Sequence, residues 1–188
     1  MPIYPVTLPT IDEKALFEYA ERCKRSFAEA PLQSPEHAAS WAALRDHVRE
    51  VFDAVKPLLD ITFVSENPYE DAESLRRAVL QEGKLAIWTG CSIHPLWSEQ
   101  ENWIFRVAHD VIPHVIYDRP LTLLGEGYAY YDHLRFCPPA ARVALFTEVI
   151  GYACGYYLDG VFPDVQKTCA LIGEQADFHA RFDAQPTV

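Results

Sequence analysis

The sixteen residues from Val143 to Leu158, with the sequence VALFTEVIGYACGYYL, carry a single charge, at Glu148. A helix that is apolar on nearly every face lies in the middle of a fold rather than on its surface. The segment therefore predicts a central helix around which other helices pack. Gly151 and Gly155, four residues apart, predict that a second backbone approaches this helix closely.

The buried position predicted for Glu148 restricts what this carboxylate does. Burying an ionised carboxylate without a partner is unfavourable, so Glu148 is expected to be protonated, paired with a cation or bound to a metal ion. An ion pair with Arg106 or Arg135 is the structural alternative to a functional role. Taken alone, this residue leaves both explanations open.

The rest of the chain predicts a mainly α protein, with one compact helical domain over residues 1–188 and at most a small two-stranded sheet. Residues 1–10 contain three prolines and are expected to form an extended lead-in. Apolar periodicity and capping residues predict helices at 12–30, 35–55, 71–82, 98–116, 122–136, 139–158 and 163–181. Short β-branched and aromatic runs predict strands at 61–64 and 85–88.

Composition excludes several classes of protein. The formal charge of −11 provides no basic surface for nucleic acid. No apolar run approaches the roughly 20 residues of a membrane helix, and the first residues lack the features of a signal peptide, so we expect a cytoplasmic location without membrane contact. The five cysteines are scattered and never in a Cys-x-x-Cys pair, which argues against both a zinc ribbon and a disulfide framework.

A second apolar segment, Ile104 to Tyr117, contains two histidines, His109 and His114. A lone histidine on an apolar face is usually a core residue, but two of them beside an acid are less easily explained that way, and neutral imidazole is the commonest metal ligand. Five residues on a regular helix leave side chains roughly 140° apart. Pro113 removes a helical hydrogen bond and is expected to bend the helix so that both imidazoles face one point.

Together, His109, His114 and Glu148 form a predicted metal site within a helical core over residues 98–181. Two imidazoles and one carboxylate are typical of non-haem iron(II) enzymes, and the same ligand types also form catalytic zinc sites. Asp110 and His94 are the candidate catalytic residues beside the metal. Arg106 and Asp110, four residues apart, are expected to form an ion pair that orients the site.

The segment His109-Asp110-Val111-Ile112-Pro113-His114 resembles the iron motif of the aromatic amino acid hydroxylases, His-Glu-x-x-Gly-His. The segment around Glu148 is similar to the apolar helix that provides that family's third ligand. The resemblance implies an iron(II) oxygenase of the hydroxylase type, with Asp110 at an acidic position beside the metal. Pro113 replaces the family's glycine, and no counterpart of its pterin-binding loop is present.

A broader pattern, from Pro68-Tyr69 to Glu148-x-x-Gly151, resembles an uncharacterised family of bacteriophage and mobile-element proteins and implies no activity. Two other functions remain open. One is a zinc-dependent hydrolase, including an HD-type phosphohydrolase with His94, His109-Asp110 and either Asp132 or Asp159. The other is a metal-free helical interaction module.

The expected partner of the iron or zinc site is a small molecule, with aromatic compounds among the candidates. Tyr128, Tyr130 and Tyr131, together with His133, have the residue types that line such a pocket, but their helical spacing favours core packing.

Overall fold

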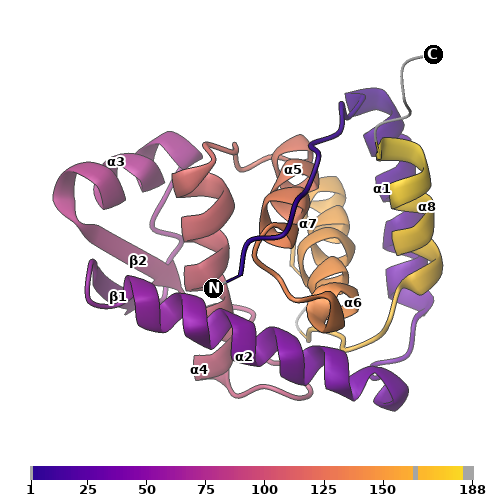
Figure 1. Ribbon diagram of the computed structural model, residues 1–188, viewed down its shortest axis with the longest axis horizontal. Helices are drawn as coiled ribbons and strands as arrows, with labels where there is room; N and C mark the ends of the chain where they lie inside the picture. Colours follow the sequence, from indigo (N-terminus) through magenta and orange to yellow (C-terminus); the bar gives the residue numbers. More distant parts are fainter. Residues whose placement is uncertain (1, 163–164, 184–188) are drawn as a thin grey trace.

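The first two long helices follow the apolar periodicity of the sequence. In the computed structural model, which describes residues 2–162 and 165–183, they are α1 (Glu13–Glu29) and α2 (Ala38–Val55), the latter preceded by a 3-10 turn (Pro35–His37). The side chain of Asp12 accepts a hydrogen bond from the N–H of Ala15 and so caps α1. In Figure 1, α2 runs along one side of the molecule and α1 lies at the end away from the strands.

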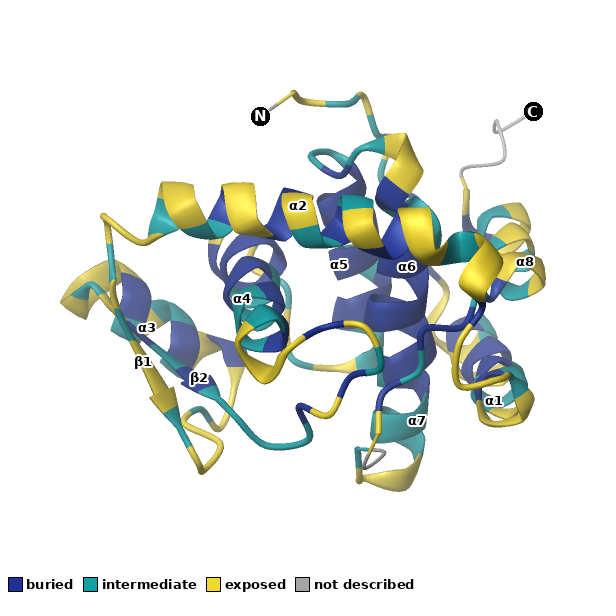
Figure 2. Ribbon diagram, turned by 90° about the horizontal axis from the view of Figure 1, so that it is seen from below, coloured by how far each residue is buried: buried dark blue, intermediate teal, exposed yellow. Residues whose placement is uncertain are grey.

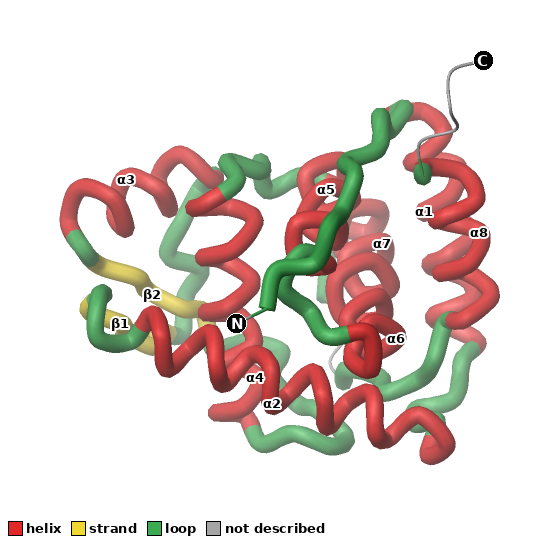
Figure 3. The backbone as a smooth tube through the Cα atoms, in the orientation of Figure 1, coloured by secondary structure: helices red, strands yellow, loops and turns green. Residues whose placement is uncertain are grey.

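The two predicted strands pair with each other. They are β1 (Asp60–Val64) and β2 (Lys84–Trp88), which run parallel, with Ile61 opposite Leu85. Parallel strands need a crossover connection, and α3 (Ala72–Glu82) provides it before the chain turns at Gly83, whose φ is 68°. Figure 3 shows this small sheet at one end of a mainly helical molecule, which confirms the predicted fold class.

The centre of the fold comes from the second half of the chain. Its helices are α4 (Glu99–His109), α5 (Leu123–Leu134), α6 (Arg142–Phe146) and α7 (Tyr152–Asp159). Two π-helices interrupt them, the first at Asp110–Ile116 after α4 and the second at Thr147–Gly151 between α6 and α7. In Figure 2, α5 is mostly buried, and so is α6 from Ala144 onward, which agrees with the apolar segment that begins at Val143.

The prediction of a closely approaching backbone at the two glycines was wrong. A side chain added at Gly151 would meet the side chains of Leu171, 2.7 Å away, and Phe27, 3.2 Å away, whereas nothing lies within 4 Å at Gly155. Side chains rather than a backbone therefore fill the space beside Gly151.

The last predicted helix, 163–181, was also wrong at its beginning. Residues 163–164 lie outside the described residues, 165–171 are not helical, and α8 is Ile172–Phe182. The segment before α8 forms parallel bridges from Val165 to Ile93 and from Thr168 to Gln33. The Lys167 ammonium donates to three carbonyl oxygens at the end of α1, which satisfies backbone groups that a helix terminus leaves unpaired.

Two clusters of buried apolar residues pack against opposite faces of α4 and the first π-helix, which form the wall between them. The larger joins α1, α2, α5, α6 and α8, and the smaller joins α3, β2 and the α4 region. Phe105 and Ile112 face the larger cluster, whereas Val107, Val111 and Val115 face the smaller. The α4 helix and the first π-helix are consequently held from both sides.

Within the described part of the chain, every helix is too short or too polar to cross a lipid bilayer. The five cysteines are all free, as the scattered spacing predicted.

Candidate metal centre

The first π-helix brings the two histidines together. Pro113 lies inside it and has no N–H to donate, and the Tyr117 N–H bonds to the carbonyl oxygen of Ile112, five residues back, at 3.3 Å. With this spacing of hydrogen bonds, residues five apart lie on the same face. The Nε2 atoms of His109 and His114 are 3.2 Å apart. The predicted break at Pro113 is therefore present, as a widened helix rather than a sharp end.

The carboxylate that faces both imidazoles is that of Glu126. Its Oε2 lies 3.2 Å from His109 Nε2, and its Oε1 lies 3.6 Å from His114 Nε2. Glu126 stands in the first turn of α5, just after Gly125, where an added side chain would come within 1.8 Å of the Pro120 carbonyl oxygen. Glycine at this position lets the preceding loop pass close to α5 and so places Glu126 over the π-helix.

His109, His114 and Glu126 can hold a metal ion, since one ligand atom from each lies within 4.8 Å of the others. Ligands about 2.0–2.2 Å from a common ion stand roughly 3.0–3.5 Å from one another. The three separations of 3.2, 3.2 and 3.6 Å are close to this range. All three side chains come from neighbouring helical turns that packing holds in place.

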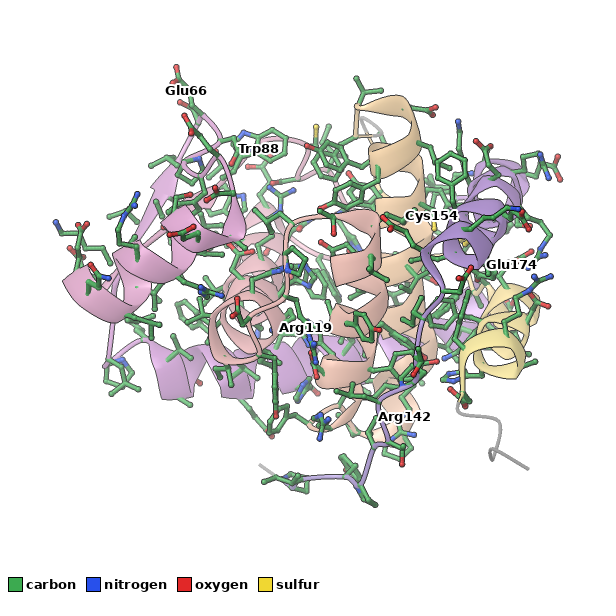
Figure 4. All side chains as sticks on the ribbon, turned by 90° about the horizontal axis from the view of Figure 1, so that it is seen from above. Glu66, Trp88, Arg119, Arg142, Cys154 and Glu174 are labelled. Atoms are coloured by element: carbon green, nitrogen blue, oxygen red, sulfur yellow. The ribbon has the colours of Figure 1, made fainter. Side chains whose placement is uncertain are left out.

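The outer nitrogen of each histidine is also engaged. His114 Nδ1 lies 2.9 Å from the carbonyl oxygen of Arg119, to which it donates, and His109 Nδ1 lies 3.2 Å from His133 Nε2. Arg119 is held in turn by Asp132 of α5, with Nε 2.5 Å from Oδ2, and Figure 4 shows Arg119 beside that helix. Donation from Nδ1 leaves His114 Nε2 with a lone pair that faces Glu126. His109 has the same form when its Nδ1–H donates to His133, and this is the arrangement that metal-binding histidines use.

The charges of the site influence one another. Burial disfavours a charged His109, but the Glu126 carboxylate outweighs this effect and raises the pKa of His109 above its ordinary value. Burial likewise disfavours ionised Glu126, but the two imidazoles lower the pKa of its carboxyl. Burial, followed by the neighbouring His109, lowers the pKa of His133 well below the ordinary range, so this imidazole is neutral. Because three electron-pair donors converge, either a proton or a metal cation has to lie among them.

The structure places Glu148 apart from these three residues. Its Oε1 lies 3.5 Å from His94 Nε2 and its Oε2 lies 3.4 Å from Gln166 Nε2. Among the described residues, no hydrogen bond or ion pair joins it to His109, His114, Arg106 or Arg135. Glu126 rather than Glu148 thus completes the cluster, and neither predicted arginine partner contacts Glu148.

The other predicted site residues have different surroundings. Asp110 follows His109, and its side chain makes no hydrogen bond or ion pair with the described residues, including the ion pair predicted with Arg106, whose carbonyl oxygen accepts from the Asp110 backbone N–H. Arg106 instead donates to the carbonyl oxygens of Trp88, at 2.6 Å, and Cys91, at 3.1 Å. His94 lies behind Glu148, stacked on Trp97 with ring centroids 4.4 Å apart.

The ligand set of an HD-type phosphohydrolase is not assembled in the described residues. Asp132 lies between Arg119 and Arg135, and Asp159 pairs with Lys24 on the surface. Tyr130 and Tyr131 pack against Phe178 in the core, as their helical spacing favoured.

A cavity of about 610 Å³ opens beside His109, His114 and Glu126, the three candidate ligands that are called the metal cluster below. His109, Asp110, His114, Glu126 and Glu148 belong to its polar lining. Another part of its wall is aromatic. There the ring of Phe162 stacks on Tyr156 with centroids 3.9 Å apart, and its centroid lies 5.7 Å from that of Trp88. In Figure 4, Trp88 stands between the strands and α7, at this wall.

Sequence reasoning did not select Glu126. The residue lies in the first turn of a helix, where an acidic side chain is ordinarily explained by the helix dipole. The one available signal was Gly125-Glu126-Gly127, because two glycines in a helical turn are unfavourable unless something approaches closely.

Comparison of the chain with protein-family models, curated proteins and solved structures finds no match. The resemblances to the aromatic amino acid hydroxylases and to phage proteins therefore stay predictions.

Proposed function

We propose that this protein is a metal-dependent enzyme, a mononuclear non-haem iron(II) oxygenase that acts on a small molecule. The observation that carries the proposal is the opening of the His109, His114 and Glu126 cluster into the aromatic cavity. Two imidazoles and one carboxylate on one side of an ion leave coordination positions open for oxygen and substrate. A cavity of about 610 Å³ lies within the range of small-molecule sites.

The aromatic wall supports oxygenase chemistry. A reactive oxidant has to be kept from water and held on its substrate, and the rings of Trp88, Tyr156 and Phe162 provide an apolar surface for this purpose. The protein side chains would bind and orient the substrate, and iron would supply the oxygen chemistry.

A zinc-dependent hydrolase is the second candidate, favoured by the position of Glu148. This carboxylate lines the same cavity and has no arginine or lysine partner among the described residues. A carboxylate that is not a metal ligand but lies beside a zinc-bound water suits metal-assisted hydrolysis, because it can accept a proton from that water.

Metal analysis of protein purified without a polyhistidine tag tests the metal site. We expect close to one divalent ion per chain, which His109→Ala and His114→Ala each abolish with little loss of helical circular dichroism. His37→Ala, outside the site, should retain the metal. Full occupancy in both site variants would disprove the site.

Nitric oxide tests the choice of iron over zinc chemistry. Added to the anaerobic iron(II) protein, it should occupy an open coordination position and give the electron paramagnetic resonance signal of a high-spin iron–nitrosyl complex. An iron-loaded protein without this signal would have no open position, and the oxygenase proposal would fail. Zinc as the one metal retained during purification would favour the hydrolase.

A further inference from the structure

Glu148 is a second buried carboxylate of the cavity that the metal cluster does not use. It stands in the second π-helix, is only 6% exposed and lines the cavity together with His109 and Glu126. Its negative charge acts on both His109 and Arg106, which locates the carboxylate near the metal cluster although it touches no member of that cluster. Such a group needs partners that stabilise it, and the structure provides two.

The first partner is His94, and its proton position is defined. The Nδ1 atom accepts hydrogen bonds from the backbone N–H groups of Leu96, at 3.2 Å, and Trp97, at 2.9 Å. An imidazole nitrogen that accepts carries no proton, so the proton is on Nε2. Among the described residues that buried N–H has no hydrogen-bond partner, and the atom nearest to satisfying it is Glu148 Oε1, 3.5 Å away. The ring is held by stacking on Trp97 and by the tilted ring of Trp41, whose centroid lies 5.3 Å away.

The second partner is Gln166, whose side-chain amide is also oriented by a hydrogen bond on the side away from Glu148. Its Oε1 accepts a hydrogen bond from the side-chain N–H of Asn102 on α4. The amide nitrogen therefore points the other way, toward Glu148 Oε2, at 3.4 Å. The Gln166 backbone N–H donates to the Ile93 carbonyl oxygen at 2.9 Å. This hydrogen bond holds the segment that contains Gln166 next to His94.

Both partners are neutral, and both contacts are long. Arg106, the one Lys or Arg side chain among the described lining residues, directs its guanidinium to the carbonyl oxygens of Trp88 and Cys91. A carboxylate held by neutral donors can take up a proton without breaking an ion pair. Long contacts also leave lone pairs free for a donor in the cavity. The surroundings fix the direction of Glu148 while leaving it able to accept a proton.

We infer that Glu148 is a catalytic residue that accepts a proton from water or another O–H ligand in the cavity, and that His94 and Gln166 position it. The O–H bond breaks, its electron pair stays on the oxygen that approaches the metal, and the proton forms a new bond to a Glu148 oxygen. The inference rests on the metal site proposed above, and it assigns to Glu148 a different role from metal ligation.

Two small ligands test the inference on the Zn²⁺-loaded protein, one that loses a proton when it binds a metal ion and one that does not. Acetohydroxamic acid has to give up a proton when it binds a metal ion, whereas acetate at neutral pH has none to give. In Glu148→Gln, acetohydroxamic acid should bind about tenfold to hundredfold more weakly, the range for loss of one charge-assisted hydrogen bond. Acetate should bind as tightly as before or more tightly, because a negative charge beside it is gone.

Asp110→Asn is the matched control, because it removes another carboxylate of the same cavity. It should strengthen acetate binding without a selective loss of acetohydroxamic acid. Gln166→Leu should give a smaller selective loss than Glu148→Gln, since one positioning contact remains. Glu148→Asp, which keeps the carboxylate but draws it back by one methylene, should lie between the wild type and Glu148→Gln.

The outcomes separate this inference from the metal site itself. If the wild-type protein retains no metal, the proposed function fails. If Zn²⁺ binds normally to Glu148→Gln and both probes change affinity in the same direction, the metal site stands and the proton-accepting role is refuted. Loss of Zn²⁺ in Glu148→Gln also overturns the inference, because Glu148 would then be a ligand.

Discussion

At the scale of single residues, the site depends on which nitrogen of each histidine carries a proton. His109 Nδ1 faces a second histidine, His133, rather than a carboxylate. In the proposed metal site Nδ1 would donate to His133. A carboxylate at that position makes a metal-bound imidazole more basic, whereas neutral His133 would leave a bound ion a stronger Lewis acid. His133 would thus be a positioning residue that acts on the ion through His109.

Replacing His133 tests this relation. His133→Leu removes the acceptor of the His109 N–H and should weaken metal binding about tenfold to hundredfold, the usual effect of losing such a partner. His133→Gln retains an acceptor oxygen and should bind metal more nearly as the wild type does. Competition with a chromophoric chelator measures both affinities. Equal losses in the two variants would show that volume matters here and the hydrogen bond does not.

A second residue-scale prediction concerns Asp110 in the metal-free protein. Burial, partly offset by His109, His114 and Arg106, raises the pKa of the Asp110 carboxyl above its ordinary value. The folded state therefore binds a proton more tightly than the unfolded state, and stability falls as pH rises from about 4 through the folded-state pKa. Asp110→Asn cannot ionise and should be more stable by about 1 kcal/mol near neutral pH.

Urea unfolding with chelator present, at a series of pH values, measures this difference. The advantage of Asp110→Asn should shrink toward acid pH, where the wild-type carboxyl is already protonated in both states. A variant that is less stable than the wild type at every pH would mean that the Asp110 carboxylate is a favourable structural contact.

Glu126 and Glu148 show how far residue-level prediction extends. Both histidines could be selected because two imidazoles in an apolar segment are unusual, and the cluster contains both. The third member could not be selected, because the choice between two buried glutamates depends on how α5 lies against the π-helix. No local pattern in the sequence encodes that packing.

At the scale of elements, the glycines of α5 and α7 differ in whether the fold needs them. An added side chain at Gly125 would overlap the Pro120 carbonyl oxygen at 1.8 Å, whereas nothing lies within 4 Å at Gly155. The loop that presents Glu126 thus depends on a glycine at position 125. Gly155 only weakens its helix.

The two glycine variants should change stability in opposite directions. Gly125→Ala forces the backbone apart and should cost about 1–3 kcal/mol, with loss of metal affinity because Glu126 moves. Gly155→Ala should stabilise by about 0.5–1 kcal/mol, since alanine is the better helix former and meets no atom. Thermal unfolding and metal titration check both. A tolerated Gly125→Ala with unchanged metal affinity would contradict the described loop.

Helix positions were mostly predictable because periodicity and caps are local signals. The Ser98 and Glu101 capping box and the Gly83 terminus are both present. The two π-helices were not predictable as such, since Pro113 was the one residue that indicated an interruption of a regular α-helix. The non-helical segment before α8 was missed because its bridges to residues 33 and 93 join distant parts of the chain.

At the scale of the whole molecule, the metal cluster lies where the two apolar clusters meet. The first π-helix belongs to their shared wall, while α5 belongs to the larger cluster alone. An ion bound by His109, His114 and Glu126 would join this wall to α5. Local opening of the π-helix would then require the metal to dissociate.

Hydrogen exchange of the backbone amides tests this coupling. An ion at a hundredfold excess over its dissociation constant adds about 2.7 kcal/mol to any opening that releases it. Amides of residues 110–116 and of the first turns of α5 should therefore exchange more slowly with metal than with chelator. Amides of α8 that exchange by local fraying should be unaffected, because α8 contributes no member of the cluster. In His114→Ala, the metal-dependent slowing should disappear. If exchange slowed equally in α8 and in the π-helix, metal would act only on global unfolding. If exchange did not slow at the π-helix, the ion would not bridge the π-helix and α5.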